Sequence, residues 1–148
     1  MNQKVTTKKR KFSTNEILEL MKARNAVLRE NIEFVQPEQL RKQLSNAIKS
    51  AGYSINSMAS ECYITPSQLH GFLKGKKQMS RDKLLSVFIT LDYSITRTQK
   101  LLIRFGYGEL YTRNLRDFII LEGIKDKIGL DEINEKLEAE SLESLCQK

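Results

Sequence analysis

Proline and glycine are scarce in this chain of 148 residues, which contains two and seven of them. A sheet of many strands needs these residues at its turns, so their scarcity favours long helices over a turn-rich β fold. Hydrophobic residues still make up 40% of the chain, which is enough for a buried core and excludes a disordered protein. The length suits one domain, or one small domain with helical extensions.

Cysteine and histidine are also scarce. Cys62 and Cys146 are too few for a disulfide framework and too far apart in sequence for a zinc site. Both are expected to be buried or idle thiols in a reducing cytosol. His70 is the single histidine, so a metal site made of several histidines is excluded. The sequence therefore predicts no metal ion and no cofactor.

Long apolar runs are missing as well. No stretch approaches the roughly 20 apolar residues that a membrane-spanning helix requires. The N-terminus is basic, but no apolar segment follows it, as one would in a secretory signal. These absences predict a cytoplasmic protein that does not associate with membranes.

Sequence motifs of enzymes are absent too. Gly106-Tyr107-Gly108 lacks the third glycine and the preceding strand of a phosphate-binding loop. Neither cysteine has a histidine nearby in sequence that would activate it as a nucleophile. The protein is therefore not expected to be an enzyme.

Positive charge is concentrated in the first part of the chain. The net charge of +7 divides into +6 over residues 1–53, +4 over residues 54–110 and −3 over residues 111–148. Such a basic front favours contact with a polyanion, although small soluble proteins are often this basic. Residues 1–12 have little hydrophobic pattern and are interpreted as a disordered basic arm. The arm could follow phosphates or a minor groove, or remain a solvated tail.

Apolar residues recur at helical spacing along the rest of the chain, and no stretch fits the alternating spacing of a strand better than that of a helix. Ser13 and Glu16 form a possible capping box, which predicts a first helix that runs to about residue 30 and a linker to residue 36. Further helices are expected at residues 37–50, 55–62, 66–73, 80–91, 95–105, 114–127 and 131–145. The sequence thus predicts an all-α protein.

Residues 53–75 predict two short helices joined by a tight turn. Thr65 can cap the second helix, Pro66 suits its first position, and Gln68 can complete a capping box. This arrangement lets the second helix protrude. An exposed helix fits the major groove of DNA, where each base pair presents a distinct edge.

The residues of this unit also follow a known pattern. Its features are Met58-Ala59 in the first helix, Ile64 after the turn, the core positions Leu69 and Phe72, the loop Lys74-Gly75-Lys76, and the run from Ser80 to Leu85. In these features the chain resembles the phage-repressor (Cro-like, lambda-repressor-like, XRE-type) helix-turn-helix family of bacterial transcriptional regulators. The resemblance implies a five-helix DNA-binding domain over residues 37–106. Residues 13–36 and 107–148 would then be helical extensions.

The sequence departs from the family pattern at four positions. Tyr63 stands at the turn, where the family usually has a glycine with positive φ. Leu73 replaces a frequent glutamate. Pro66 and Gly71 occupy two surface positions that commonly read bases, and neither has a side chain that can form a hydrogen bond.

The resemblance implies that helix 66–73 reads the major groove. Direct base contact is then left to Ser67, Gln68 and His70. Gln68 could pair with adenine or act as the capping partner of Thr65, and His70 could face bases or phosphate or be merely exposed. The lysines after the helix would contact phosphates. The candidate DNA-binding residues are Thr65, Ser67, Gln68, His70, Lys74, Lys76 and Lys77.

These features predict a sequence-specific DNA-binding transcriptional regulator. A homodimer is expected, because one recognition helix reads only a few base pairs. Its interface would use apolar residues at 17–28 or 118–145. The alternative is a protein-binding module, such as an anti-defence inhibitor or a signalling adaptor. In that case the helix-turn-helix is a scaffold and the helical extensions bind the partner.

Overall fold

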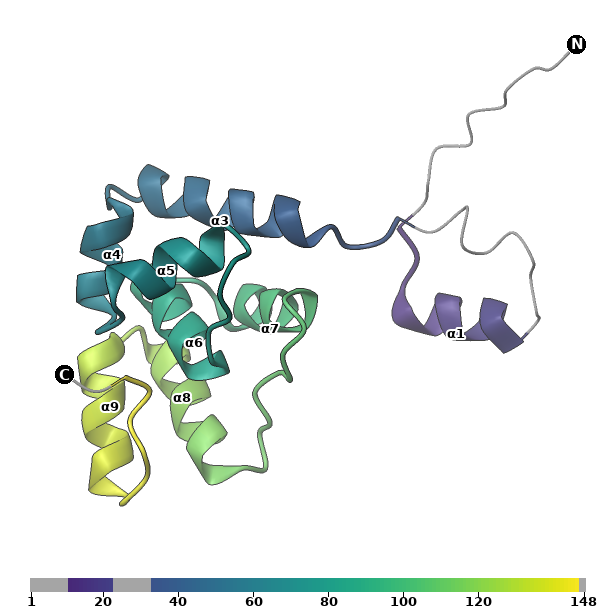
Figure 1. Ribbon diagram of the computed structural model, residues 1–148. Coiled ribbons are helices and arrows are strands. Elements are labelled where there is room, and N and C mark those ends of the chain that lie inside the picture. Colours follow the sequence, from purple (N-terminus) through teal and green to yellow (C-terminus); the bar gives the residue numbers. More distant parts are fainter. Residues whose placement is uncertain (1–10, 23–32, 147–148) are drawn as a thin grey trace, which may run out of the picture. The chain divides into compact units, whose positions relative to one another are not determined.

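The computed structural model describes residues 11–22 and 33–146 (Figure 1). In these two stretches all regular secondary structure is α-helical, which confirms the predicted all-α class. No helix in them is long and apolar enough to cross a membrane. The chain divides into two compact units, Met1–Val35 (unit 1) and Gln36–Lys148 (unit 2). The predicted basic arm lies outside the described residues as far as residue 10.

The described part of unit 1 contains one helix, α1 (Thr14–Lys22). Its start is the predicted one, because Ser13 Oγ accepts a hydrogen bond from the Glu16 backbone N–H at 3.1 Å. The predicted continuation of this helix falls outside the described residues. Leu18 and Met21 of α1 are exposed.

The described part of unit 2 contains seven helices at the predicted places. They are α3 (Pro37–Ser50), α4 (Ile55–Glu61), α5 (Pro66–Leu73), α6 (Arg81–Thr90), α7 (Ile95–Arg104), α8 (Leu115–Asp126) and α9 (Leu130–Ala139).

Side-chain caps explain where most of these helices begin. In five of them a side-chain oxygen just before the helix accepts a hydrogen bond from the backbone N–H three residues later, which satisfies one free donor of the first turn. The capping residues are Ser54, Thr65, Ser80, Ser94 and Asn114. Gly52, with φ of +92°, follows the end of α3 as the sequence predicts.

The predicted extent of the last helix is wrong, because α9 ends at Ala139 and not near Leu145. The chain reverses at Ser141, which has a left-handed φ of 57°. The returning segment is fixed by Asn134, whose Oδ1 accepts from the Leu145 backbone N–H at 2.7 Å. Leu142 and Leu145 thus keep an apolar periodicity, but they pack against the unit from a returning tail and not from a helix.

α6 is the central helix of unit 2. Five consecutive residues, Leu84 to Phe88, are 0% exposed, so α6 is covered on every side along this stretch. Figure 1 shows α6 between the pair α4–α5 and the pair α8–α9. Side chains from α3 through to the C-terminal tail belong to one hydrophobic core. The helices after residue 106 therefore complete the same core as the helices before it.

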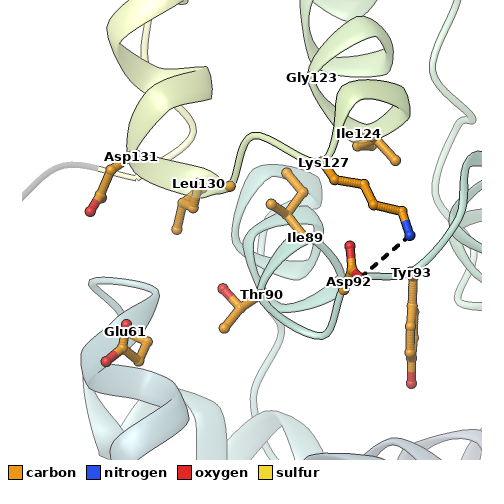
Figure 2. Close-up of a pocket in the computed structure, with 11 residues that line it drawn as sticks. Glu61, Ile89, Thr90, Asp92, Tyr93, Gly123, Ile124, Lys127, Leu130 and Asp131 are labelled. Atoms are coloured by element: carbon orange, nitrogen blue, oxygen red, sulfur yellow. Dashed lines mark ion pairs between the residues drawn. The ribbon is translucent and has the colours of Figure 1, made fainter.

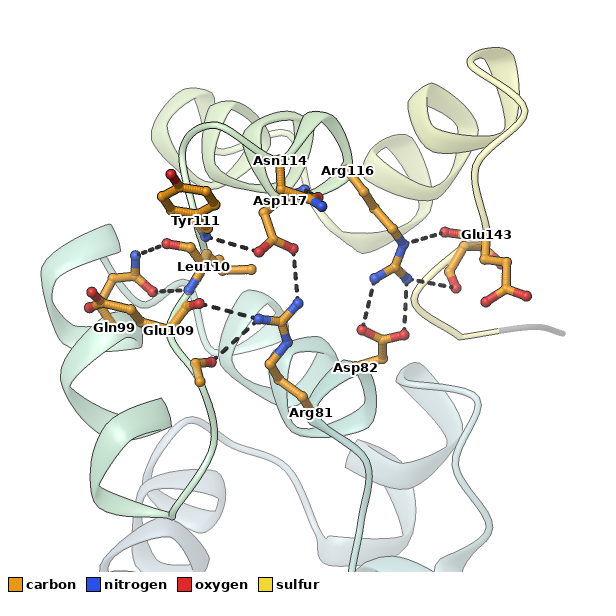
Figure 3. A network of polar contacts seen from close by, with 12 residues as sticks. Arg81, Asp82, Gln99, Glu109, Leu110, Tyr111, Asn114, Arg116, Asp117 and Glu143 are labelled. Atoms are coloured by element: carbon orange, nitrogen blue, oxygen red, sulfur yellow. Dashed lines mark hydrogen bonds and ion pairs between the residues drawn. The ribbon is translucent and has the colours of Figure 1, made fainter.

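Two ion pairs join the beginning of α6 to the beginning of α8 (Figure 3). Arg81 Nη2 lies 2.9 Å from Asp117 Oδ1, and Arg116 donates to both carboxylate oxygens of Asp82 at 3.1 and 2.9 Å. The second oxygen of the buried Asp117 accepts from the Tyr111 backbone N–H at 2.9 Å. Each helix contributes one cation and one anion, so the pairs fix the register of α8 on α6.

Most apolar residues at positions 118–145 are buried inside unit 2, which leaves little of the suggested dimer surface free. The exception is Phe118, which is 47% exposed, together with Leu115, which is 57% exposed one turn earlier on α8. The buried residues are Ile119, Ile120, Leu121, Ile124, Leu130, Ile133, Leu137 and Leu145.

Both cysteines are buried as free thiols, as expected from the sequence. Burial raises the pKa of the Cys62 thiol from 9.0 to about 12, and burial also raises that of Cys146. At about pH 8 the reactive thiolate form of Cys62 is then roughly a thousandfold rarer than in an unfolded chain.

We expect both thiols to resist iodoacetamide in the native protein and to react fully in denaturant, measured by mass spectrometry. Native labelling at the rate of a free thiol would contradict this burial.

Candidate nucleic-acid interface

The turn between α4 and α5 holds the two helices in a fixed relation. Tyr63 has a left-handed φ of 56°, the conformation for which the family pattern has glycine. The phenol donates a hydrogen bond to Asp131 Oδ1 of α9 at 2.8 Å. This bond, with the charge of Asp131, raises the pKa of Tyr63. Ile64, next in the turn, is buried and donates its N–H to the Ala59 carbonyl at 2.9 Å. Tyr63 is thus tied to another helix and keeps the backbone that the turn requires.

α5 has one buried and one outward side. Leu69 and Phe72 are buried, and the ring of Phe72 packs on that of Phe105. The first residues of the helix, including Pro66 and Ser67, are exposed. The structure thus presents the first two residues of α5 to solvent, while Leu69 and Phe72 anchor the helix in the core.

The three predicted base-reading residues all have partners within the domain. Ser67 Oγ accepts from Lys77 Nζ at 2.9 Å, and Gln68 Oε1 accepts from Lys83 Nζ at 2.7 Å. His70 Nε2 lies 2.9 Å from Asn56 Oδ1 of α4. An amide oxygen only accepts, so His70 must carry its proton on Nε2 for this bond.

Thr65 caps α5 as predicted, because its Oγ1 accepts from the Gln68 backbone N–H at 3.2 Å. The capping box predicted for this pair needs a reciprocal bond from the Gln68 side chain. That side chain reaches Lys83 of α6 instead. Gln68 therefore links the two helices across their outer surface.

Gly71 is not a surface position, which corrects the expectation from the sequence. The side chain of Lys77 lies over it, so a Cβ built at Gly71 would stand 2.7 Å from Lys77 Cδ and 2.8 Å from Cγ. The carbonyl of Gly71 also accepts the backbone N–H groups of Lys76 and Lys77 at 2.8 and 3.1 Å. The loop after α5 thus folds back onto the helix and covers this glycine.

The loop places several cations beside α5. Lys74, Lys76 and Lys77 are exposed, and in the described residues none forms an ion pair with a carboxylate. Gly75 between them has φ of +76°, and a Cβ built there would stand 2.7 Å from Nη2 of Arg41. Unpaired exposed lysines are free to neutralise phosphates.

Sequence reasoning missed three cations of this surface. Arg41 reaches the loop from α3, Lys83 reaches Gln68 from α6, and Lys49 of α3 lies with Lys74 on the rim of a hollow. The hollow has a volume of about 390 Å³ and is also lined by the polar residues Ser45, Ser54, Asn56 and His70. No sequence signal marked these cations, since charged residues on amphipathic helices are normally just solvated.

A second hollow, of about 310 Å³, lies where α4 and α6 meet α8 and α9 (Figure 2). Its walls carry the carboxylates of Glu61, Asp92 and Asp131, with Lys127 Nζ 3.9 Å from Asp92. Such a lining repels a polyanion. Among the described residues no cluster of histidine, cysteine, aspartate or glutamate could hold a metal ion.

Comparison with protein-family models, with curated proteins and with solved structures gave no match to this chain.

Proposed function

We propose that unit 2 binds double-stranded DNA as a transcription regulator, with α5 in the major groove. The observation that carries the proposal is the pair α4–α5, whose second helix is anchored by Leu69 and Phe72 and exposes its first two residues beside lysines that form no ion pair in the described residues. Helix N-termini and lysines are the groups that position proteins on a phosphate backbone. The order and short lengths of α3 to α7 support the five-helix repressor-like domain that the sequence resemblance implies.

A homodimer would let two copies of α5 read paired half-sites. Leu115 and Phe118 are the exposed apolar pair of α8 and provide one possible contact between copies. The residues at 17–28 provide another, of which α1 exposes Leu18 and Met21.

The proposal is tested by titrating labelled duplexes, one from upstream of the protein's own gene and one of random sequence. The wild type is expected to prefer the first and to weaken steeply between about 50 and 200 mM salt. Log K falls with log salt, and the double variant Lys74→Gln/Lys76→Gln should make this fall shallower by about 2 in slope. Each lost phosphate contact removes about 0.9 from the magnitude of the slope. Anisotropy measures both effects.

The matched control is Lys125→Gln/Lys136→Gln, which removes the same charge from exposed lysines of α8 and α9. It should leave the slope nearly unchanged. Equal and weak binding of both duplexes by the wild type would contradict the proposed function.

That outcome would favour the second candidate, a protein-binding module. The exposed apolar side chains Leu115 and Phe118, with Tyr111 just before α8, support this candidate. Partner binding would then be lost in the variant Leu115→Ser/Phe118→Ser, whereas the lysine variants would retain it.

A further inference from the structure

The side chain of Lys77 takes the space that a residue at position 71 would fill. On a helix, position 71 lies about one turn from Ser67, and in α5 the Lys77 side chain covers this position. A Cβ at Gly71 would stand 2.7 Å from Lys77 Cδ, and the Lys77 ammonium reaches on to Ser67 Oγ at 2.9 Å. We infer that Lys77 makes the central base contact of α5 and that its target is guanine. This inference rests on the proposed function.

The loop holds Lys77 in this place before any ligand arrives. Its backbone N–H and that of Lys76 both donate to the Gly71 carbonyl, at 3.1 and 2.8 Å. Ser67 then fixes the far end of the side chain. A lysine restrained at both ends loses less rotamer entropy on binding than a free one, so it can act as a specific contact.

The groups around Lys77 present donors and few acceptors. An ammonium group has donors only, and the Gln68 carbonyl oxygen already accepts from Lys83 Nζ at 2.7 Å. The Gln68 amide N–H groups remain available. In the major groove guanine offers two acceptors, N7 and O6, whereas adenine offers one acceptor and one donor. A surface of donors therefore matches guanine, and the glutamine–adenine pairing suggested by the sequence is disfavoured.

Lys76 is the natural comparison, because it is the neighbouring exposed lysine of the same loop. Its side chain does not cover Gly71, and no described residue forms a hydrogen bond with it. It has the same charge as Lys77 without the same restraint. A phosphate contact, which carries no sequence information, is what such a lysine provides.

The test is selection from a duplex library with randomised central positions, performed with the full chain of the wild type, Lys77→Met and Lys76→Met. Methionine keeps the aliphatic cover over Gly71 but removes the ammonium. The wild type should enrich guanine at one position of each half-site, and Lys77→Met should lose that preference about 5- to 100-fold. Lys76→Met should keep the preference for guanine, and its affinity should fall by the same factor for all duplexes.

Two further measurements strengthen the result. Replacing that guanine by 7-deazaguanine should weaken binding of the wild type and leave Lys77→Met unaffected, because N7 is the lost acceptor. Gly71→Ala, which displaces the Lys77 side chain without removing it, should lose the same preference while circular dichroism shows the helices intact.

Guanine reading by Lys77 is contradicted if Lys77→Met lowers the affinity for all sites equally, as expected of a phosphate contact, or if the wild type enriches adenine there. In both cases sequence-specific DNA binding itself would stand. Enrichment of no sequence by the wild type would overturn the proposed function and the role of Lys77 together.

Discussion

A chain that ends at Gly106 is expected to lose its cooperative thermal unfolding transition, although it keeps α3 to α7. The reason lies in α6, whose residues Leu84 to Phe88 are all fully buried. The helices before residue 106 cover one side of α6, and α8 and α9 cover the other (Figure 1). Exposure of an apolar side chain costs about 1.5–3 kcal/mol, and a whole domain is stable by only about 5–15 kcal/mol. Exposing several such side chains therefore costs as much free energy as the whole unit gains by folding.

The transition is measured by circular dichroism against temperature, with a chain that lacks residues 1–10 as the control. That deletion removes residues that precede unit 2, and it should leave the transition in place. A sharp transition of the chain that ends at Gly106 would contradict the shared core. It would show instead that residues 37–106 fold alone, as the domain limits expected from the sequence imply.

The helices before residue 106 could be predicted from the sequence because residues next to each boundary determine where the helix begins or ends. Thr65 and Ser80 each precede an apolar periodicity and cap the N–H three residues later. Gly52 supplies the left-handed residue after α3. The helix pattern placed the turn at Tyr63, but its left-handed backbone could be expected only through the family resemblance, since a tyrosine is not an obvious residue for positive φ.

Other features depend on contacts that no local pattern encodes. Ser141 adopts a left-handed backbone without being glycine, so the end of α9 had no visible signal. The bonds from Lys77 to Ser67 and from Lys83 to Gln68 join residues 10 and 15 positions apart. Both depend on the path of the loop after α5. The exposed residues of α5 and of its loop were therefore predictable, but the cations that reach them from other helices and the hydrogen bonds among them were not.

This pattern changes the interpretation of Gly71. From sequence alone, a glycine at a base-reading position looks like the loss of a contact. In the structure the absence of a Cβ is what admits the Lys77 side chain, which brings an ammonium to the same surface. The surface is thus supplied with cations from outside α5, by Lys77 from the loop and Lys83 from α6.

The variant Asp117→Ala is expected to destabilise unit 2 by about 2–4 kcal/mol. Asp117 is 6% exposed and accepts hydrogen bonds from Arg81 and from the Tyr111 backbone N–H (Figure 3). Its removal leaves both donors without this acceptor, and breaking a buried ion pair costs about 3–5 kcal/mol. The Arg81 side chain is 28% exposed, so water replaces part of the lost interaction. The expected cost, about 2–4 kcal/mol, is therefore lower than that of breaking a fully buried ion pair.

Urea unfolding measures the loss, with Glu122→Ala as the matched control, because Glu122 is an exposed carboxylate on the same helix. That control should change the unfolding free energy by no more than about 0.5 kcal/mol. Asp117→Asn keeps one acceptor oxygen and should fall between the two. Equal effects of Asp117→Ala and Glu122→Ala would mean that the ion pairs do not hold α8 on α6. If Asp117→Ala destabilises the unit as expected, the DNA binding that we propose should also weaken, since Arg81 begins the helix from which Lys83 reaches Gln68.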